Sequence, residues 1–367
     1  MKKAIVLIAL IPVFCLILTP VNAAEITADS DTAEDVFNEE NYIPQYVLDI
    51  INENGSDTEK YSDISALFSF CVSVLKESVS AYTQSFSQIF VIIFVIAIFR
   101  KINDNQSFLM IANLVFTAVI AKEFIFILSE LFEQSESVLE ADKQIITVTL
   151  PSVVTILMMG GGAVSASGSA VSFAGVMSVL DLAVSDVVGV MLTVAAVLLI
   201  FEKLSPAFSE LNSSRFIKKY TVITFSFITS LMLTVMTYQN VLNARADSLT
   251  SRTVKFAASN FIPIVGNAVG ESYKTVSAGI SYLKTSLGGI TSAAIFFTFF
   301  PIIANIVIIK IFFSFSGFVS SLCGCAEEKN FFEGITNILD ILLSVIICSA
   351  ILSFMLMFLF AVIAFGY

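Results

Sequence analysis

Long apolar runs separated by shorter polar segments make up most of the chain after residue 78. A helix needs about 20 mainly apolar residues to cross the hydrocarbon core of a bilayer, and six runs meet this requirement. They are Val79–Phe99, Phe108–Leu128, Ala183–Phe201, Tyr220–Tyr238, Gly288–Ile309 and Ile341–Phe365. The pattern predicts an all-α, polytopic integral membrane protein with about six transmembrane helices.

Two further apolar stretches are too short to cross a bilayer. Ile145–Met159 contains Pro151 and is followed by three glycines, and Phe256–Ala268 contains Pro263. Short hydrophobic segments that Gly or Pro interrupts are typical of re-entrant or interfacial pieces, whose free backbone groups need protein or water around them. We therefore predict a segment of this kind at each of the two prolines.

The same two prolines indicate an internal repeat. Pro151 aligns with Pro263, and a Val-Ser-Ala triplet follows each proline at the same distance. This similarity predicts two parallel membrane repeats, residues 145–240 and 241–367, with the order proline segment, amphipathic helix, span, span. Residues 79–144 then form an N-terminal pair of transmembrane helices. The identities are sparse, so chance similarity is the alternative.

The beginning of the chain is arranged as a secretory signal. Two lysines precede the apolar run Ala4–Leu18, and small residues follow up to Ala23. This order predicts a cleaved signal peptide over residues 1–23, with an uncleaved anchor as the alternative. Residues 24–78 then form an acidic extracytoplasmic head that ends in an amphipathic helix.

The polar connections set the expected orientation. With the head outside the cytoplasm, the inner connections are Arg100–Ser107, Glu202–Lys219 and Lys310–Asp340. Lys and Arg are denser there than in the outer stretches, as the positive-inside rule requires. Several outer cations, Arg252 and Lys255 among them, run against this bias.

The composition agrees with a membrane protein and argues against common enzyme classes. The chain is 57% hydrophobic and 13% charged, whereas soluble domains carry about 25% charged residues. It contains no histidine, the commonest general base and metal ligand. The sequence shows no nucleotide-binding glycine loop, nucleophile motif or metal-ligand cluster, and its net charge is −11. We therefore predict no enzyme, no cofactor, no metal and no nucleic-acid partner, and a lipid bilayer as the surroundings.

A few charged residues lie in or beside the apolar runs. Lys122 and Glu123 lie near the outer end of the second predicted span, Asp181 and Asp186 enter the third, and Asp340 precedes the last. An ionisable residue inside the membrane is a candidate functional residue. The alternative, which we favour because all of them lie near predicted span ends, is that Lys122 snorkels and the aspartates lie at the interface.

The stretch Ser251–Gly270 contains two cations, an Asn-Phe-Ile-Pro motif and a glycine pair between hydrophobic blocks. With the upstream Leu-Pro pair, the signal peptide and the order of the blocks, it resembles the stage III sporulation protein AE family. The candidate partner-docking residues are Arg252, Lys255, Asn260, Phe261, Pro263 and Gly266, with Pro151 upstream.

The resemblance implies a function that composition alone does not show. Members of this family are multi-pass membrane components of a channel complex between mother cell and forespore, in the mother-cell-derived outer forespore membrane. The implied partners are the other stage III A sporulation proteins and, through them, stage II sporulation protein Q. The implied role is forespore maintenance and late forespore-specific gene expression, with no catalytic residues to carry over.

A second functional class stays open at this point. Broken helices and an internal repeat are also typical of transporters that bind a small solute near the middle of the membrane. The alternative prediction is therefore a small-solute transporter or permease that acts in its own right.

Overall fold

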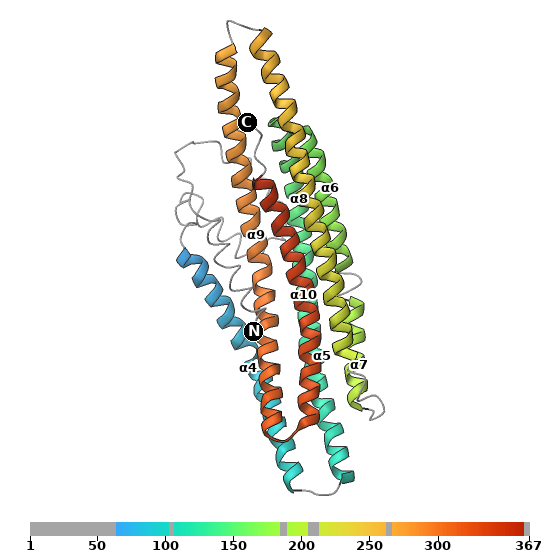
Figure 1. Ribbon diagram of the computed structural model, residues 1–367. Coiled ribbons are helices and arrows are strands. Elements are labelled where there is room, and N and C mark those ends of the chain that lie inside the picture. Colours follow the sequence, from blue (N-terminus) through green and yellow to red (C-terminus); the bar gives the residue numbers. More distant parts are fainter. Residues whose placement is uncertain (1–63, 103–105, 184–188, 205–212, 262–265, 363–367) are drawn as a thin grey trace. The chain divides into compact units, whose positions relative to one another are not determined.

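The computed structural model describes residues 64–102, 106–183, 189–204, 213–261 and 266–362 (Figure 1). The regular structure of these residues is helical throughout, which confirms the all-α class. The helices are α4 (Ile64–Ile102), α5 (Gln106–Met159), α6 (Ala163–Leu182), α7 (Leu192–Leu204), α8 (Ser213–Phe261), α9 (Gly266–Leu322) and α10 (Ala326–Val362). The predicted signal peptide and the head up to residue 63 lie outside the described residues. The contacts discussed below lie within residues 75–367, which form one compact unit.

Six of the described helices are long and apolar enough to cross a membrane: α4, α5, α6, α8, α9 and α10. The number agrees with the sequence prediction, but the third span differs. The prediction placed it at Ala183–Phe201, whereas the structure has the candidate helix one segment earlier, at Ala163–Leu182. Within the predicted range, α7 contributes a helix of only 13 residues, and residues 184–188 lie outside the described part of the chain.

Three of the helices are much longer than a bilayer crossing requires. α5, α8 and α9 contain 54, 49 and 57 residues. At about 1.5 Å per residue they are about 75–85 Å long, against about 30 Å for the hydrocarbon core of a bilayer. Each of these helices therefore extends well beyond the membrane that it crosses.

The first predicted short segment is the end of one of these long helices. Ile145–Met159 forms the last part of α5, and Pro151 lies inside that helix rather than at a break. Proline removes one backbone hydrogen bond, but Pro151 lies on the exposed face of α5, while Val153 and Leu157 beyond it are fully buried. Packing of this buried face continues on the far side of the proline, so the structure has one continuous helix where a separate re-entrant or interfacial segment was predicted.

The three predicted inner connections meet at one end of the bundle. Arg100 at the end of α4 pairs with Glu328 at 2.8 Å, and Lys203 at the end of α7 pairs with Glu327 at 3.4 Å. Both glutamates lie in the first turn of α10. The contacts agree with the predicted order of crossings, while the side of the membrane that this end faces stays a prediction.

The α9–α10 hairpin occupies the centre of the core. A tight turn connects the two helices at Cys323–Cys325, where Gly324 has a φ of 75°, a left-handed conformation that glycine adopts without strain. α4 packs against α9 through Phe86, whose ring stacks on Phe312 with centroids 4.4 Å apart. α5, α7 and α8 also contact α10. The predicted repeats stay a prediction.

Candidate functional site

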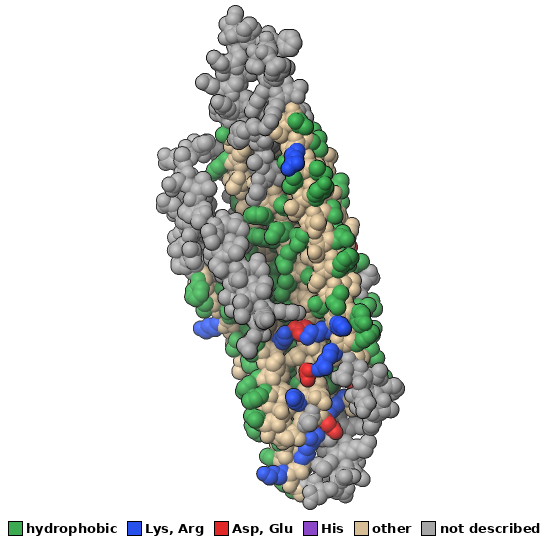
Figure 2. Space-filling model, viewed as in Figure 1, with side chains coloured by type: hydrophobic (Ala, Val, Ile, Leu, Met, Phe, Trp, Pro, Cys, Tyr) green, Lys and Arg blue, Asp and Glu red, His purple; other side chains and the backbone are tan. Residues whose placement is uncertain are grey.

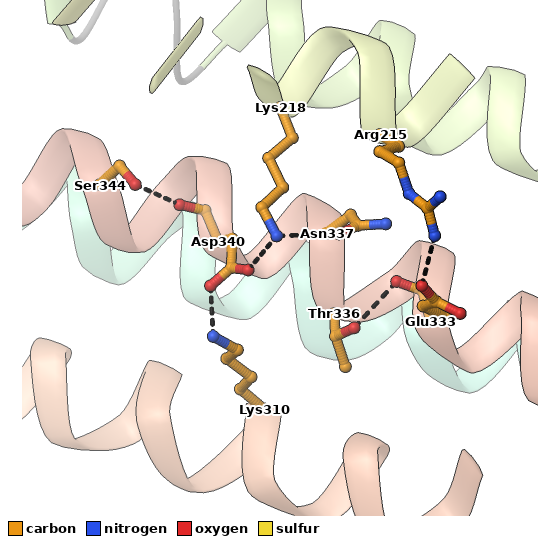
Figure 3. Close-up of polar contacts among 8 residues, drawn as sticks. All are labelled: Arg215, Lys218, Lys310, Glu333, Thr336, Asn337, Asp340 and Ser344. Atoms are coloured by element: carbon orange, nitrogen blue, oxygen red, sulfur yellow. Dashed lines mark hydrogen bonds and ion pairs between the residues drawn. The ribbon is translucent and has the colours of Figure 1, made fainter. Parts of the chain in front are cut away.

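Asp340 of α10 lies between two lysines that come from two other helices (Figure 3). Lys218 of α8 and Lys310 of α9 each donate a hydrogen bond to a different oxygen of its carboxylate. Lys218 also donates to the side-chain oxygen of Asn337 at 2.9 Å. We call these four residues the ion cluster. A single carboxylate thus connects three helices.

The ion cluster lies at the end of the apolar spans. Lys218 comes just before the predicted span of α8, Lys310 follows that of α9, and Asp340 precedes that of α10. Their side chains keep 31%, 33% and 20% of their surface exposed. Charges that are partly withdrawn from water depend strongly on their partners. The cluster therefore fixes the positions of α8, α9 and α10 relative to one another along the helix axes.

More charged residues lie between the ion cluster and the start of α10. Arg215 pairs with Glu333 at 2.6 Å, and both side chains are largely exposed. Burial lowers the pKa of the Lys203 ammonium, and the nearby carboxylates of Glu328 and Glu327 oppose that change. On the face shown in Figure 2, several basic and acidic side chains gather in one part of an otherwise largely apolar surface. This distribution is typical of the interfacial end of a membrane bundle.

α6 and α8 form a close seam. Asp247 of α8 accepts hydrogen bonds from the backbone amides of Val164 and Ser165, at 3.1 and 2.8 Å, in the first turn of α6. Further along, a Cβ on Gly168 would lie 1.8 Å from the side-chain nitrogen of Asn243. Small residues let helices approach closely in membranes. The glycine- and serine-rich start of α6 therefore serves a tight helix crossing.

The α8–α9 hairpin extends beyond this seam. α8 continues from Asp247 to Phe261, which at about 1.5 Å per residue places its end about 20 Å past the start of α6. α9 begins at Gly266 and contacts α8. We call residues 251–270, at the far end of this hairpin, the hairpin tip.

The hairpin tip carries most of the sequence-predicted docking residues. The structure places Arg252, Lys255, Asn260 and Phe261 in the last turns of α8 and Gly266 as the first residue of α9. Pro263 and the side chains of this set lie outside the described part of the structure. Phe256–Phe261, expected to belong to a separate short segment, is instead the end of a 49-residue helix.

The predicted intramembrane charges do not form one site. Lys122 and Glu123 lie 3.8 Å apart, and the Lys122 side chain is 81% exposed, so it points away from the bundle. Asp181 pairs with Lys143 at 2.8 Å and connects α6 to α5. Asp186 lies outside the described residues. These positions are consistent with structural charges at helix surfaces.

Sequence reasoning missed the residues that make the strongest polar contacts. Lys218 and Lys310 entered the sequence analysis only through the charge of the inner connections. Their positions beside apolar runs could have identified them as candidate site residues. Asp142 fell in a stretch read as an outer connection, whereas it is fully buried in α5. Helical periodicity would have revealed it, because Leu139 and Ile146 share its face.

Comparisons with known proteins agree with the resemblance found in the sequence. Residues 46–366 match the family described as stage III sporulation protein AE. The chain is also similar to the stage III sporulation protein AE of Bacillus subtilis (strain 168), with 24% identity over 143 residues, which cover 39% of this chain and 36% of that protein. The chain thus matches about a third of the curated relative's length, and no solved structure matches it. Because the family match covers most of the chain and six helices can cross a membrane, this protein is a membrane protein that belongs to the stage III sporulation protein AE family.

Proposed function

We propose that this chain is a multi-pass membrane component of the sporulation channel complex that links mother cell and forespore. Family membership supports the sporulation role. The observation that carries the proposal is the α8–α9 hairpin, which runs about 20 Å past the start of α6. A long helical hairpin that continues beyond the membrane bundle offers a rigid surface for partner proteins.

The proposed partners follow from the family and from the position of the hairpin tip. The chain lies in the mother-cell-derived outer forespore membrane and docks onto other stage III A sporulation proteins. Through them it is connected to stage II sporulation protein Q. The complex maintains the forespore and permits late forespore-specific gene expression. In this proposal Arg252 and Lys255 supply charge for docking, and Asn260 and Pro263 belong to the segment that the partner proteins recognise.

A matched pair of proline substitutions tests this proposal. Pro263→Ala changes the hairpin tip, whereas Pro301→Ala changes a proline inside α9, away from the tip. We expect Pro263→Ala to reduce spore counts and co-purification with the other stage III A proteins, with the protein still inserted in the membrane. Pro301→Ala should leave both closer to wild type. Equal spore counts for the two variants and wild type would argue against docking through the tip.

The alternative function is a small-solute transporter that acts in its own right. It rested on the predicted internal repeat and on two broken segments, of which the one at Pro151 lies within continuous α5. Buried polar groups inside the bundle, such as Asp142, are the observation that still favours it. Purified protein that moves a solute across liposomes without partners would support the transporter, and a lack of such activity together with partner co-purification would support the channel component.

A further inference from the structure

Asp142 interrupts an otherwise uncharged stripe on α5. The buried face of this helix recurs every three or four residues, as expected for one side of an α-helix. Its members from the middle to the end of the helix are Ser135, Leu139, Asp142, Ile146, Thr149, Val153 and Leu157. Asp142 lies in the centre of this stripe with no exposed surface. A carboxyl group therefore occupies a position where the fold otherwise places apolar or hydroxyl side chains.

The Asp142 carboxyl has a single hydrogen-bond donor among the described residues. The hydroxyl of Ser353 on α10 donates to Oδ2, while Oδ1 is buried and has no hydrogen-bond partner in the described part of the chain. Ser349, one turn earlier on α10, is also buried with an unpartnered hydroxyl. Asp142 thus receives one hydrogen bond from α10, and a second buried serine lies one turn away on that helix.

Among the residues that the structure describes, none supplies a counter-ion to this carboxyl. The adjacent Lys143 pairs instead with Glu140 at 2.9 Å and with Asp181 of α6 at 2.8 Å. α10 has no charged residue between Asp340 and Val362, and α9 has none between Lys284 and Lys310. On α7, which also contacts α5, the charged residues are Glu202 and Lys203 near its C-terminus, and Lys203 pairs with Glu327 at the end of the bundle.

An ionised carboxylate in these surroundings is strongly disfavoured. Moving a carboxylate from water to a site without a counter-ion and with few hydrogen bonds has a large unfavourable free energy. One hydrogen bond from a hydroxyl group offsets only a small part of it. A bound proton removes the charge and gives the carboxyl a donor of its own. We propose that Asp142 is a proton-binding site, occupied when α5 and α10 are packed as in this structure. The proposal goes beyond the channel role and does not depend on it.

Loss of the proton should loosen the contact between α5 and α10. A charged Asp142 needs water or a cation, and neither can reach the carboxyl while both helices stay packed around it. Unfolded chain, by contrast, ionises this residue at an ordinary carboxyl's pH because water surrounds it. Raising the pH therefore favours the unfolded or opened state over the packed one. Asp142 therefore contributes most to the stability of the packed bundle in acid, and this contribution is lost as the pH rises.

Infrared spectroscopy and thermal unfolding of the full chain in nanodiscs test the proposal. Wild-type protein at neutral pH should show a carbonyl stretch of a protonated carboxylic acid, and Asp142→Asn should lack that band. As the pH rises from acid to neutral, the unfolding temperature of wild type should fall relative to that of Asp142→Asn. Asp181→Asn, which removes an exposed carboxylate near the same part of α5, should keep both the band and the wild-type pH dependence.

Two results would overturn the assignment. One is a wild-type spectrum without the acid band, or a band that persists in Asp142→Asn. The other is an identical pH dependence of unfolding in wild type and Asp142→Asn. If the asparagine variant does not fold, Ser353→Ala decides the question. Removing the hydroxyl that donates to Oδ2 should shift the acid band to higher frequency, and an unshifted band would contradict a proton at Asp142.

Discussion

The Asp247 carboxylate of α8 accepts a hydrogen bond from the backbone amide of Ser165 at 2.8 Å, and so caps α6 from a neighbouring helix. The first amides of a helix have no partner within that helix, and α6 has no side-chain cap of its own. Asp247 therefore completes the start of α6 and joins it to the helix that continues to the hairpin tip. The packing of the bundle and the position of the tip depend on the same contact.

Replacing this capping carboxylate should weaken the α6–α8 seam. Asp247→Ala leaves the buried amide of Ser165 and the partly buried amide of Val164 without this acceptor, which costs about 1–3 kcal/mol of unfolding free energy. Asp247→Asn keeps one side-chain oxygen and should cost less. Thermal unfolding in detergent measures the difference. Equal stability of wild type and Asp247→Ala would mean that the cap contributes nothing.

Two adjacent glycines of α9 provide a matched test of helix packing. A Cβ on Gly288 would lie 2.7 Å from the Cβ and 3.3 Å from the Cα of Ala361 on α10, whereas Gly289 has open space around it. Gly288→Ala should therefore force α9 and α10 apart and lower the unfolding free energy by about 1–3 kcal/mol. Gly289→Ala should leave stability unchanged or slightly raised, because alanine favours helix. Similar losses in both variants would contradict the close approach of the two helices.

The ion cluster should be far more sensitive to charge removal than the exposed pair beside it. Asp340→Asn leaves Lys218 and Lys310 partly buried without a counter-ion. We expect the unfolding free energy to fall clearly. The loss should stay below the value of about 3–5 kcal/mol that is typical when a fully buried pair is broken, because the cluster keeps some exposure. Glu333→Gln breaks only the exposed pair with Arg215 and should cost about 0–1 kcal/mol.

A second substitution tests whether the uncompensated charge of the lysines causes the loss of stability in Asp340→Asn. Asp340→Asn combined with Lys310→Met removes one of the two uncompensated cations. It should recover part of the stability that Asp340→Asn alone loses. Chemical or thermal unfolding of the single and double variants provides this double-mutant cycle. Strictly additive losses would show that the lysines and the carboxylate do not interact.

The two cysteines of the α9–α10 turn should differ in reactivity. Burial, and then the nearby Glu328 carboxylate, raises the pKa of the Cys325 thiol. Alkylation requires the thiolate, so Cys325 should react slowly at neutral pH and faster as the pH rises. Cys323, which is only partly buried, serves as the internal reference. Mass spectrometry after timed iodoacetamide treatment measures both, and faster modification of Cys325 would contradict its buried position.

The sequence predicted best those helices whose apolar runs end at charged residues. The predicted final span, Ile341–Phe365, begins directly after Asp340 inside α10 and follows that helix to Val362, where the described residues end. α6 was not predicted as a span of its own, and the serine and glycine residues at its start make its close contact with α8. Membrane spans are recognised in a sequence by their apolar side chains, whereas close packing between membrane helices requires small side chains.

The candidate sites were harder to predict than the spans for a related reason. Asp142 lies among Glu136, Glu140 and Lys143, and a run of polar residues suggests a connection rather than a helix. Only the helical period shows that Glu136 and Glu140 face outward while Asp142 faces the core. The residues of the ion cluster come from three helices that are far apart in the sequence. Only the folded structure shows that Asp340 lies between Lys218 and Lys310.

Cysteine-accessibility mapping tests the central claim most directly, namely that the hairpin tip lies outside the cytoplasm and the charged end of the bundle lies within it. Ser251→Cys and Asn267→Cys report on the tip, and Ser213→Cys reports on the start of α8, on a background without the native cysteines. When the protein is produced in the plasma membrane of non-sporulating cells, a membrane-impermeant reagent added to intact cells should label the first two, and should label the third only after permeabilisation. Labelling of Ser213→Cys alone would invert the topology and remove the hairpin tip from the proposed partners.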